Sequence, residues 1–160
     1  SRPHTTKELM WALACIDVAG RGTVLVQSGE RNRLIVADLR ARKARLTEVC
    51  PYEWTLPADP EPMANVVRDV IADRLDAVLF TNQVQCRHLF QIASAMGLSD
   101  ELRHALNTRT VVAVIGPVCR AALKEHGVTP RVMPAVPKMG PLVAALAEYL
   151  DLTSSSTPEL

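Results

Sequence analysis

The chain has 160 residues, of which 48% are hydrophobic and 22% are charged, and its formal net charge is +1. These values suit one globular domain, or a little more than half of a two-lobed protein, and they exclude the strong positive field typical of proteins that bind nucleic acid or anionic membranes. No apolar run approaches the roughly 20 residues of a membrane span, and the first residues lack the apolar core of a secretory signal. We therefore expect a cytoplasmic protein, unless its true beginning is missing.

The N-terminal part of the chain predicts a helix, a strand and a second helix. Thr5 and Glu8 have the spacing of a capping box and precede apolar residues at helical spacing, so a helix should span residues 6–17. Residues 23–27, TVLVQ, are typical of a buried strand. The turn Ser28-Gly29-Glu30 should then lead into the second helix.

The middle of the chain contains a basic run and a proline-rich segment. We interpret the basic run RARKAR, residues 40–45, as a solvated helix face. Four prolines within residues 50–62 disfavour a helix and favour an extended connector. This connector is the one internal candidate for a boundary between lobes.

From residue 61 onward, helices and strands alternate again. Apolar strands are followed by short polar or glycine turns and then by amphipathic helices, an order that predicts a parallel sheet covered on both faces. The expected elements are a helix over residues 61–71, a strand at 77–80, a helix over 84–96 closed by Gly97, a strand at 111–116, a helix that stops at Gly127, and a last helix over 140–150.

Three turns at the ends of predicted strands form the candidate binding site. They are Ser28-Gly29-Glu30, Thr81-Asn82-Gln83 and Gly116-Pro117-Val118-Cys119. In a parallel α/β sheet, such turns lie where the strands end and the helices begin, and backbone N–H groups at helix starts suit carboxylates or phosphates. The alternative is that each turn caps its own helix with side-chain oxygens and needs no ligand.

Motifs for several other kinds of chemistry are absent from the sequence. Gly20 and Gly22 precede a strand rather than follow it, which argues against a dinucleotide site, and neither a phosphate-binding loop nor a nucleophile elbow is present. The four cysteines are far apart, and we interpret them as reduced, buried thiols. The four histidines lie in separate elements, so we expect no metal site.

The order of these segments resembles the C-terminal half of the uroporphyrinogen-III synthase family. The resemblance covers residues 5–150, and it implies a three-layer α/β/α fold with a parallel five-stranded sheet, the flavodoxin-like half of a two-lobed protein. The segments that carry it are VLVQSGERNRLIVADLRARKARLTEVCPYEW, DAVLFTN, VVAVIGPVCRAALKEHGV and PKMGPLVAAL.

The resemblance also implies how the chain is divided among lobes. Residues 1–20 would be a helix from the preceding lobe, and residues 21–54 would be the strand-helix-strand start of one lobe with its connector. Residues 55–150 would form the remainder of the α/β lobe, and residues 151–160 a disordered tail. The complementary pieces would come from about 100 missing N-terminal residues, or from a second copy that exchanges halves.

The activity that the resemblance implies is a cyclisation in porphyrin and heme biosynthesis. The linear tetrapyrrole hydroxymethylbilane loses water and closes to uroporphyrinogen III with inversion of ring D, and the family uses no cofactor. The protein's main contribution would be to hold a flexible polycarboxylate in one reactive geometry.

Particular residues match the family's site. Tyr52 matches a tyrosine that faces the cleft and would hydrogen-bond the departing hydroxyl as a weak general acid. The alternative is that its ring only packs beside Trp54. Thr81 and Asn82 match the family's F-T-S turn, with asparagine in place of serine.

The last turn both supports and weakens the match. Gly116 and Pro117 match the family's G-P turn, whereas Val118 and Cys119 stand where the family usually has threonines. The loss of two hydroxyls favours a second hypothesis, a non-catalytic regulatory domain that senses a tetrapyrrole or another polyanion. A third is an interaction domain whose crevice binds nothing.

Overall fold

The structure is a computed structural model that describes residues 5–29 and 31–154. By its internal contacts the chain divides into two compact units, Ser1–Thr55 and Leu56–Leu160, and each is described by itself. The division falls within the proline-rich segment, residues 50–62. None of the described helices is both long and apolar enough to cross a membrane.

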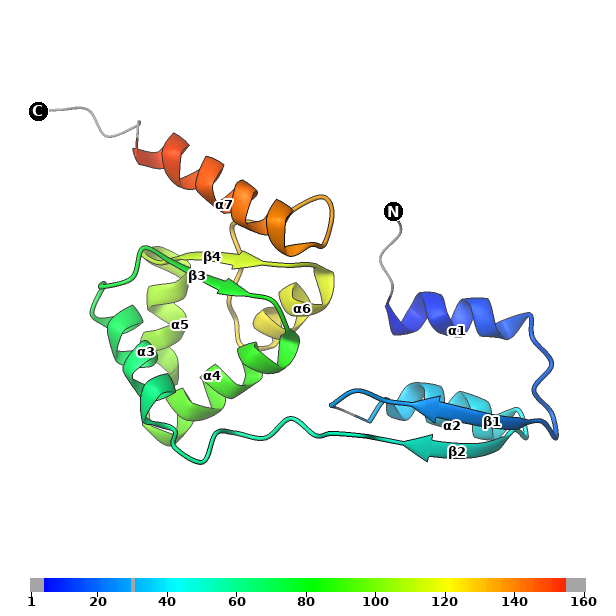
Figure 1. Ribbon diagram of the computed structural model, residues 1–160. Coiled ribbons are helices and arrows are strands. Elements are labelled where there is room, and N and C mark those ends of the chain that lie inside the picture. Colours follow the sequence, from blue (N-terminus) through cyan, green and yellow to red (C-terminus); the bar gives the residue numbers. More distant parts are fainter. Residues whose placement is uncertain (1–4, 30, 155–160) are drawn as a thin grey trace, which may run out of the picture. The chain divides into compact units, whose positions relative to one another are not determined.

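The first unit contains a two-stranded parallel sheet and two helices. Its small core joins Val18, Ile35 and Leu39 to half-buried residues of the sheet, among them Leu25 and Leu46. The elements are α1 (Thr6–Ala14), β1 (Gly22–Val26), α2 (Arg33–Ala41) and β2 (Arg45–Val49), shown at the blue and cyan end of the chain in Figure 1.

The predicted capping box of α1 is present. The Thr5 N–H donates to a Glu8 carboxylate oxygen at 2.9 Å, and hydrogen bonds from the Thr5 hydroxyl and backbone lower the pKa of Glu8. The helix ends at Ala14, earlier than predicted, because Asp17 accepts from the Ala19 N–H at 3.1 Å in the following turn.

The interpretation of residues 40–45 as a solvated helix face is wrong, because they span the end of α2, a turn and the first residue of β2. An Arg40 guanidinium nitrogen lies 2.8 Å from a Glu48 carboxylate oxygen, and Arg45 Nε donates to the Gly20 carbonyl at 3.0 Å. Local acceptors therefore hold these cations. The basic run spans the end of one element and the start of the next.

One face of the β1–β2 sheet is open among the described residues of its unit. Side chains alternate along a strand, and Leu25 faces the helices whereas Val24 and Val26 are 64% and 67% exposed. Val49, which pairs with Val26, is exposed as well. A parallel sheet normally has both faces covered, so this face lacks a layer within its own unit.

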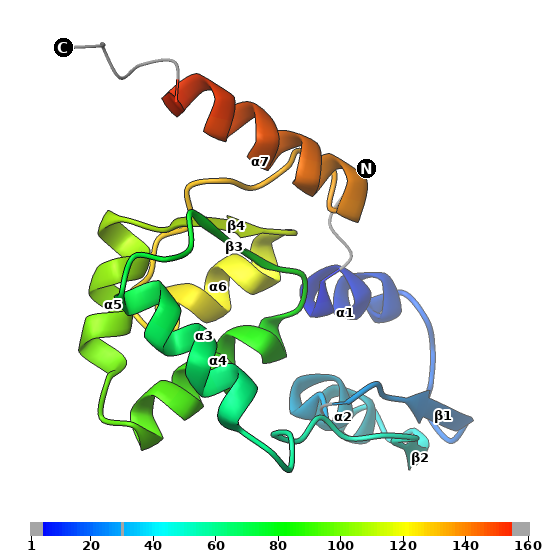
Figure 2. The ribbon, with the colours of Figure 1, turned by 60° about the vertical axis from the view of Figure 1, so that its left-hand side comes forward.

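The second unit is built around the parallel pair β3 (Ala77–Phe80) and β4 (Val111–Val114). Figures 1 and 2 show α7 on one side of this pair and the other helices of the unit on the opposite side. Those helices are α3 (Glu61–Ile71), α4 (Gln83–Ala95), α5 (Ser99–Thr108) and α6 (Pro117–Glu125), and α7 spans Met139–Ser154.

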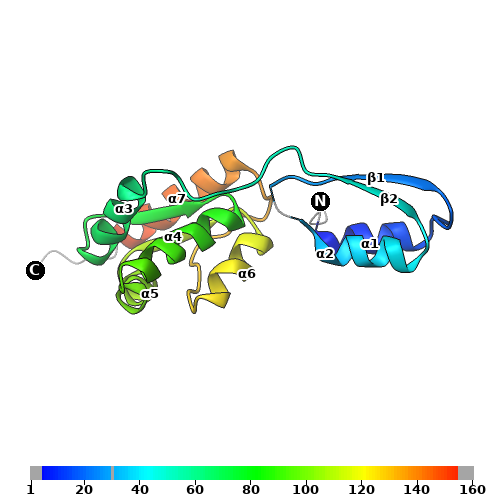
Figure 3. The ribbon, with the colours of Figure 1, turned by 90° about the horizontal axis from the view of Figure 1, so that it is seen from below.

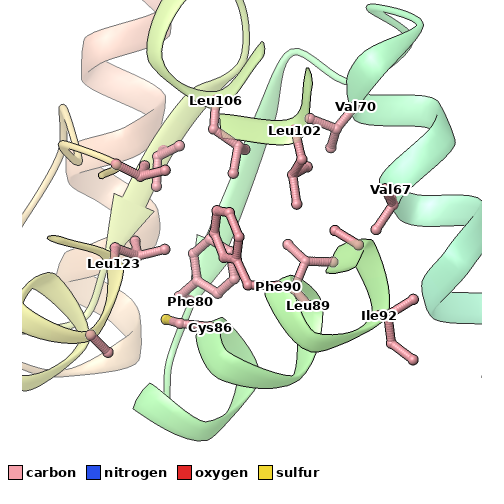
Figure 4. Packing of buried hydrophobic residues seen from close by; sticks show 14 of the residues in the cluster. Val67, Val70, Phe80, Cys86, Leu89, Phe90, Ile92, Leu102, Leu106 and Leu123 are labelled. Carbon is pink, nitrogen blue, oxygen red and sulfur yellow. The ribbon is translucent and has the colours of Figure 1, made fainter. Parts of the chain in front are cut away.

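Two groups of apolar side chains hold these layers together. The larger core packs α3, α4, α5 and α6 onto one face of the strands, and Figure 4 shows Phe80 and Phe90 facing Leu102, Leu106 and Leu123 across it. The smaller core packs α7 against the other face through a few buried residues, namely Val111, Ala113, Val132, Leu142 and Leu146.

The α/β class agrees with the sequence analysis, but the predicted five-stranded sheet is wrong. The described residues form two separate two-stranded parallel sheets, one in each unit. A further strand beside β4 is reduced to an isolated bridge between Ala113 and Val132. Pro130 and Pro134 flank Val132 and have no N–H to donate, which explains why the pairing does not extend.

Two helices differ from the sequence-based expectation. The α5 helix was not predicted, although Leu102 and Leu106 lie four residues apart on its buried face. The α7 helix includes residues 151–154, which the sequence analysis placed in the disordered tail, while residues 155–160 lie outside the described residues.

Thr110 offers a test of the larger core. It is fully buried, and within the described residues its hydroxyl has no hydrogen-bond partner. Thr110→Val keeps the shape and removes the unpaired polar group, so it should raise the free energy of unfolding by about 1 kcal/mol in urea melts followed by circular dichroism. Thr108→Val is the control, because Thr108 is exposed and its hydroxyl donates to the His104 carbonyl at 2.8 Å. A less stable Thr110→Val variant would contradict this description.

Candidate functional site

Two of the three predicted turns lie together at one edge of the second unit. Because β3 and β4 are parallel neighbours, their carboxyl ends meet, and the Ile115 N–H donates to the Phe80 carbonyl at 3.0 Å just beyond them. Residues 81–83 and 116–119 therefore stand side by side, at the N-termini of α4 and α6. We call these two segments the rim.

The α4 half of the rim is closed by its own side chains. Asn82 caps the helix, and its side-chain oxygen accepts from the Val84 N–H at 2.8 Å. Gln85 Oε1 accepts from the N–H groups of Thr81 and Asn82 at 3.0 and 3.1 Å, and from the Thr81 hydroxyl at 3.2 Å. The capping alternative thus describes this turn, and an anion must displace the Gln85 carboxamide to reach these N–H groups.

The α6 half of the rim is open. Gly116 is the N-cap and has no side chain to accept a hydrogen bond, and Pro117 has no N–H to offer. In the part of the chain that the structure describes, the N–H groups of Val118 and Cys119 have no acceptor. These donors stand at the positive end of the helix dipole, so this is the end of the rim suited to a carboxylate.

The structure adds a segment to the rim that the sequence did not indicate. A Cβ placed on Gly116 would lie 3.3 Å from the Pro137 Cβ, so the chain leading into α7 passes beside the start of α6. Lys138 follows directly, and its carbonyl accepts from the Leu142 N–H at 3.0 Å in the first turn of α7. The approach of Pro137 to Gly116 joins segments that are distant in the sequence, so no local pattern predicts it.

The first predicted turn, residues 28–30, does not start a helix as expected. The α2 helix begins at Arg33, and its cap is Asn32, whose side-chain oxygen accepts from the Ile35 N–H at 3.3 Å. Ser28 is exposed, and Glu30 lies outside the described residues. The cap of α2 is therefore Asn32, which follows the predicted turn at residues 28–30.

Gly29 is instead tied to the connector. Its N–H donates to the Tyr52 carbonyl at 3.2 Å, and its carbonyl accepts from the Trp54 N–H at 3.3 Å. The rings of Tyr52 and Trp54 meet edge to face with centroids 5.8 Å apart. Tyr52 is nevertheless half exposed, and its phenol has no hydrogen-bond partner among the described residues. Its predicted catalytic role remains a prediction.

A cavity in the second unit lies away from the rim. It has a volume of about 870 Å³ and is bordered by the distal halves of α4 and α6 and by α5. Arg87, Arg103, Lys124 and the acidic Glu125 line it, together with polar and apolar side chains. It contains none of the predicted site residues, and the unpaired donors that suit a carboxylate are at the other end of α6.

The cysteines differ in burial from the sequence-based interpretation. All four are free, but Cys15 and Cys50 are exposed, and only Cys86 and Cys119 are buried. Among residues 5–29 and 31–154, no group of three or more histidine, cysteine, aspartate or glutamate side chains could hold a metal ion.

The fold and the rim define an α/β protein with unpaired helix N–H groups at the carboxyl ends of its β3–β4 pair. Comparison with known families makes the class specific. The family model described as uroporphyrinogen-III synthase HemD matches residues 1–144, and the chain belongs to this family. The predicted resemblance is thereby confirmed.

Similar proteins agree with this placement. The chain is 32% identical over 148 residues to an uncharacterized protein, YjjA, of Bacillus subtilis, covering 92% of this chain and 54% of the relative. It is 29% identical over 144 residues to a putative uroporphyrinogen-III synthase of Methanothermobacter thermautotrophicus, covering 90% and 55%. The chain thus spans a little over half the length of these curated relatives.

Solved structures show the same relation. A uroporphyrinogen III synthase from the extremely thermophilic bacterium Thermus thermophilus superimposes with a TM-score of 0.60 at 27% identity, covering 95% of this chain and 59% of that chain. A second Thermus thermophilus uroporphyrinogen III synthase structure gives a TM-score of 0.57 at 30% identity, covering 92% and 58%.

Gly29 allows its pairing with the connector to be tested. We call the two hydrogen bonds of Gly29 with Tyr52 and Trp54 the strap. Its φ is +75°, and an added Cβ would lie 1.8 Å from the Trp54 ring. Gly20 is the matched control, because its φ is +67° but nothing lies within 4 Å of its added Cβ. Gly20→Ala should lower the free energy of unfolding by about 1 kcal/mol, and Gly29→Ala by roughly 2 kcal/mol more, since it adds a clash to the backbone strain.

Urea unfolding followed by tryptophan fluorescence measures both variants, in a Trp11→Phe background so that Trp54 is the reporter. Equal losses for the two alanine variants would show that Trp54 does not cover Gly29.

Gln85 allows the closed half of the rim to be tested. An NMR titration with tricarballylate, a small tricarboxylate, should shift the amide signals of Val118 and Cys119 and leave those of Thr81 and Asn82 nearly unchanged. Gln85→Ala should add shifts at Thr81 and Asn82, because their N–H groups become free, and should lower the free energy of unfolding by about 1 kcal/mol. Gln85→Glu, which keeps the acceptor and adds negative charge, is the control and should show no such gain. A uniform response of all four amides in the unmodified chain would contradict the open and closed halves.

Proposed function

We propose that the chain is the C-terminal half of a uroporphyrinogen-III synthase, which cyclises hydroxymethylbilane to uroporphyrinogen III with inversion of ring D and loss of water. Membership of the family supports the class of reaction. The single observation that carries the proposal is the open start of α6, where the N–H groups of Val118 and Cys119 stand unpaired beside the matching Gly116-Pro117 turn. Donors in this position suit the carboxylates of a tetrapyrrole.

In this proposal the protein mainly orients its substrate. Departure of the terminal hydroxyl as water creates an electrophile on the substrate itself, so no nucleophilic side chain is required. The rim would hold carboxylates, at α6 directly and at α4 once the Gln85 carboxamide moves aside. Fixing a flexible chain in one reactive geometry removes much of the entropic part of the barrier and selects the inverted closure.

Tyr52 is proposed as the weak general acid. Loss of hydroxide from the substrate needs a proton, and a half-exposed phenol with no hydrogen-bond partner among the described residues can hydrogen-bond the departing oxygen and supply one. Its ring also rests against Trp54, which would fix the direction of the phenol. The packing interpretation and the catalytic interpretation are therefore compatible.

The active unit is proposed to include more than this chain. The relatives and solved structures are nearly twice as long, and the open valine face of the β1–β2 sheet supports a further layer there. An N-terminal segment of about 100 residues, or a second copy of the chain, would supply it.

A second candidate function is a non-catalytic domain that senses a tetrapyrrole or another polyanion. Val118 and Cys119 carry no hydroxyl, and Gln85 already occupies the donors of α4. A rim with one open helix end could bind a carboxylate without directing ring closure.

Hydroxymethylbilane provides the decisive assay. The whole protein that carries this chain should yield uroporphyrinogen III, identified by chromatographic separation of the oxidised isomers. The 160-residue chain should do so only where a second copy supplies the missing layer. Tyr52→Phe should lower the turnover number at least about tenfold, because it removes the proton donor and keeps the ring. Tyr149→Phe, at the other tyrosine of the chain, should have no effect.

Formation of isomer I alone, at the rate seen without protein, would refute catalysis. Tricarballylate shifts at the rim amides would then favour the sensing function, and their absence would refute both.

A further inference from the structure

The cavity bordered by α4, α5 and α6 collects positive side chains from three helices. It has a volume of about 870 Å³, and Figure 3 shows α5 and α6 beside α4, which contacts both. Arg87 of α4, Arg103 of α5 and Lys124 of α6 line it. Glu125 is the one acidic side chain among the described residues that line it, so positive charge is in excess.

The cations are not needed to complete the helix ends beside the cavity. Lysine and arginine often stabilise the last carbonyls of a helix, and both α4 and α6 end here. These carbonyls already accept backbone N–H groups, however. The Leu98 N–H donates to the Ala93 carbonyl at 2.8 Å, and the Val128 N–H donates to the Leu123 carbonyl at 3.0 Å. Helix capping therefore does not account for the positive charge.

Two of the cations are available to a ligand. Lys124 is exposed and forms no ion pair with any residue that the structure describes. An Arg103 guanidinium nitrogen lies 2.6 Å from an Asp100 carboxylate oxygen, but these side chains are 46% and 81% exposed, and such a pair adds little stability in water. Asp100 can therefore release Arg103 to an anion of higher charge.

Neutral donors lie beside the cations. The side chains of Gln91, Ser94 and Ser99 line the cavity, and none of them makes a hydrogen bond to a described residue. Ser99 is the first residue of α5, and the cap of that helix is Leu98, which has no polar side chain. The cavity thus combines two free cations with uncapped donors from a third side.

The α5 and α6 walls are fixed to each other by Asn107. Its side-chain nitrogen donates to the Gly127 carbonyl at 2.9 Å, and its side-chain oxygen accepts from the Thr129 N–H at 3.0 Å. The stem of Arg103 crosses Gly127 so closely that an added Cβ would lie 2.9 Å from the Arg103 Cδ. Arg103 is therefore held against the end of α6 before any ligand binds, which lowers the entropic cost of binding.

One wall of the cavity is aromatic. The rings of Phe90 and His126 both line it, and they stack in parallel with centroids 4.3 Å apart. Phe90 belongs to the larger core and is 4% exposed, so it holds the imidazole in place from below. His126 is half-buried, and its ring nitrogens have no hydrogen-bond partner in the described part of the chain. An apolar or planar group can lie against this wall.

We propose that this cavity is a binding site for a small organic phosphate. A phosphate monoester carries nearly two negative charges and three acceptor oxygens in a tetrahedral arrangement, so it uses donors from several directions, whereas one guanidinium alone can hold a planar carboxylate. The volume of about 870 Å³ lies within the range for small-molecule sites, which leaves room for an organic part against His126. The inference does not depend on the proposed function, because the cavity contains no residue of the rim.

An NMR titration of the chain with phenyl phosphate tests the site. Saturable shifts are expected at the backbone amides of Ser99 and Lys124 and at the ring of His126, at lower concentrations than any shifts of the rim amides. Inorganic phosphate should shift the same signals with at least about tenfold lower affinity, because it has no ring to cover the aromatic wall. Tricarballylate should also bind there at least about tenfold more weakly than phenyl phosphate.

Charge variants supply the second measurement. Lys124→Gln and Arg103→Gln each remove one positive charge from an exposed side chain, and each should weaken phenyl phosphate about fivefold while the fold is kept. Arg74→Gln is the matched control, because Arg74 is exposed and does not line the cavity, and it should leave the affinity unchanged.

Three results would overturn the proposal: no saturable shift at Ser99, Lys124 and His126, unchanged affinity in both cavity variants, or tricarballylate binding as tight as that of phenyl phosphate. The amides of Val118 and Cys119 are observed in the same spectra, so a failure of the cavity is distinguished from a failure of the rim.

Discussion

The parallel pairing of β3 with β4 is the constraint on which the rest of the second unit depends. Parallel strands end at the same edge, so residues 81–83 and 116–119 become neighbours although the chain between them forms two helices and a strand. The same pairing sets α4 beside α6, with the N-termini of both helices at this edge. The candidate binding site is thus a result of one strand register.

The N–H groups at the start of α4 are hydrogen-bonded and those at the start of α6 are not, and the neighbouring residues explain the difference. Asn82 and Gln85 supply side-chain oxygens, so the donors of α4 are used, whereas Gly116 and Pro117 supply none, so the donors of α6 stay open. The open donors at the start of α6 are peptide groups rather than lysine or arginine side chains, so the partial positive charge of this helix end does not depend on the chain's net charge of only +1.

Local patterns predicted much of the fold, and non-local contacts account for most of what was missed. The strands and most helices follow from apolar periodicity, and the spacing of Thr5 and Glu8 predicts their capping box. Asn82 and Gln85 have the same spacing, and the apolar face of α5 has helical spacing too, so the sequence holds a local signal for both features that the predictions lack. By contrast, the separation into two sheets, the strap at Gly29 and the approach of Pro137 to Gly116 depend on distant segments, which spacing alone does not encode.

Because one face of the β1–β2 sheet is open, adjacent residues of β1 differ in what they contact. Leu25 packs into the small core of its unit, while Val24 and Val26 point away from it into solvent. Polar replacements at the two valines leave that core untouched, whereas a change at Leu25 weakens the unit itself. Core-forming and solvent-facing positions thus alternate over three consecutive residues, although all three side chains are aliphatic.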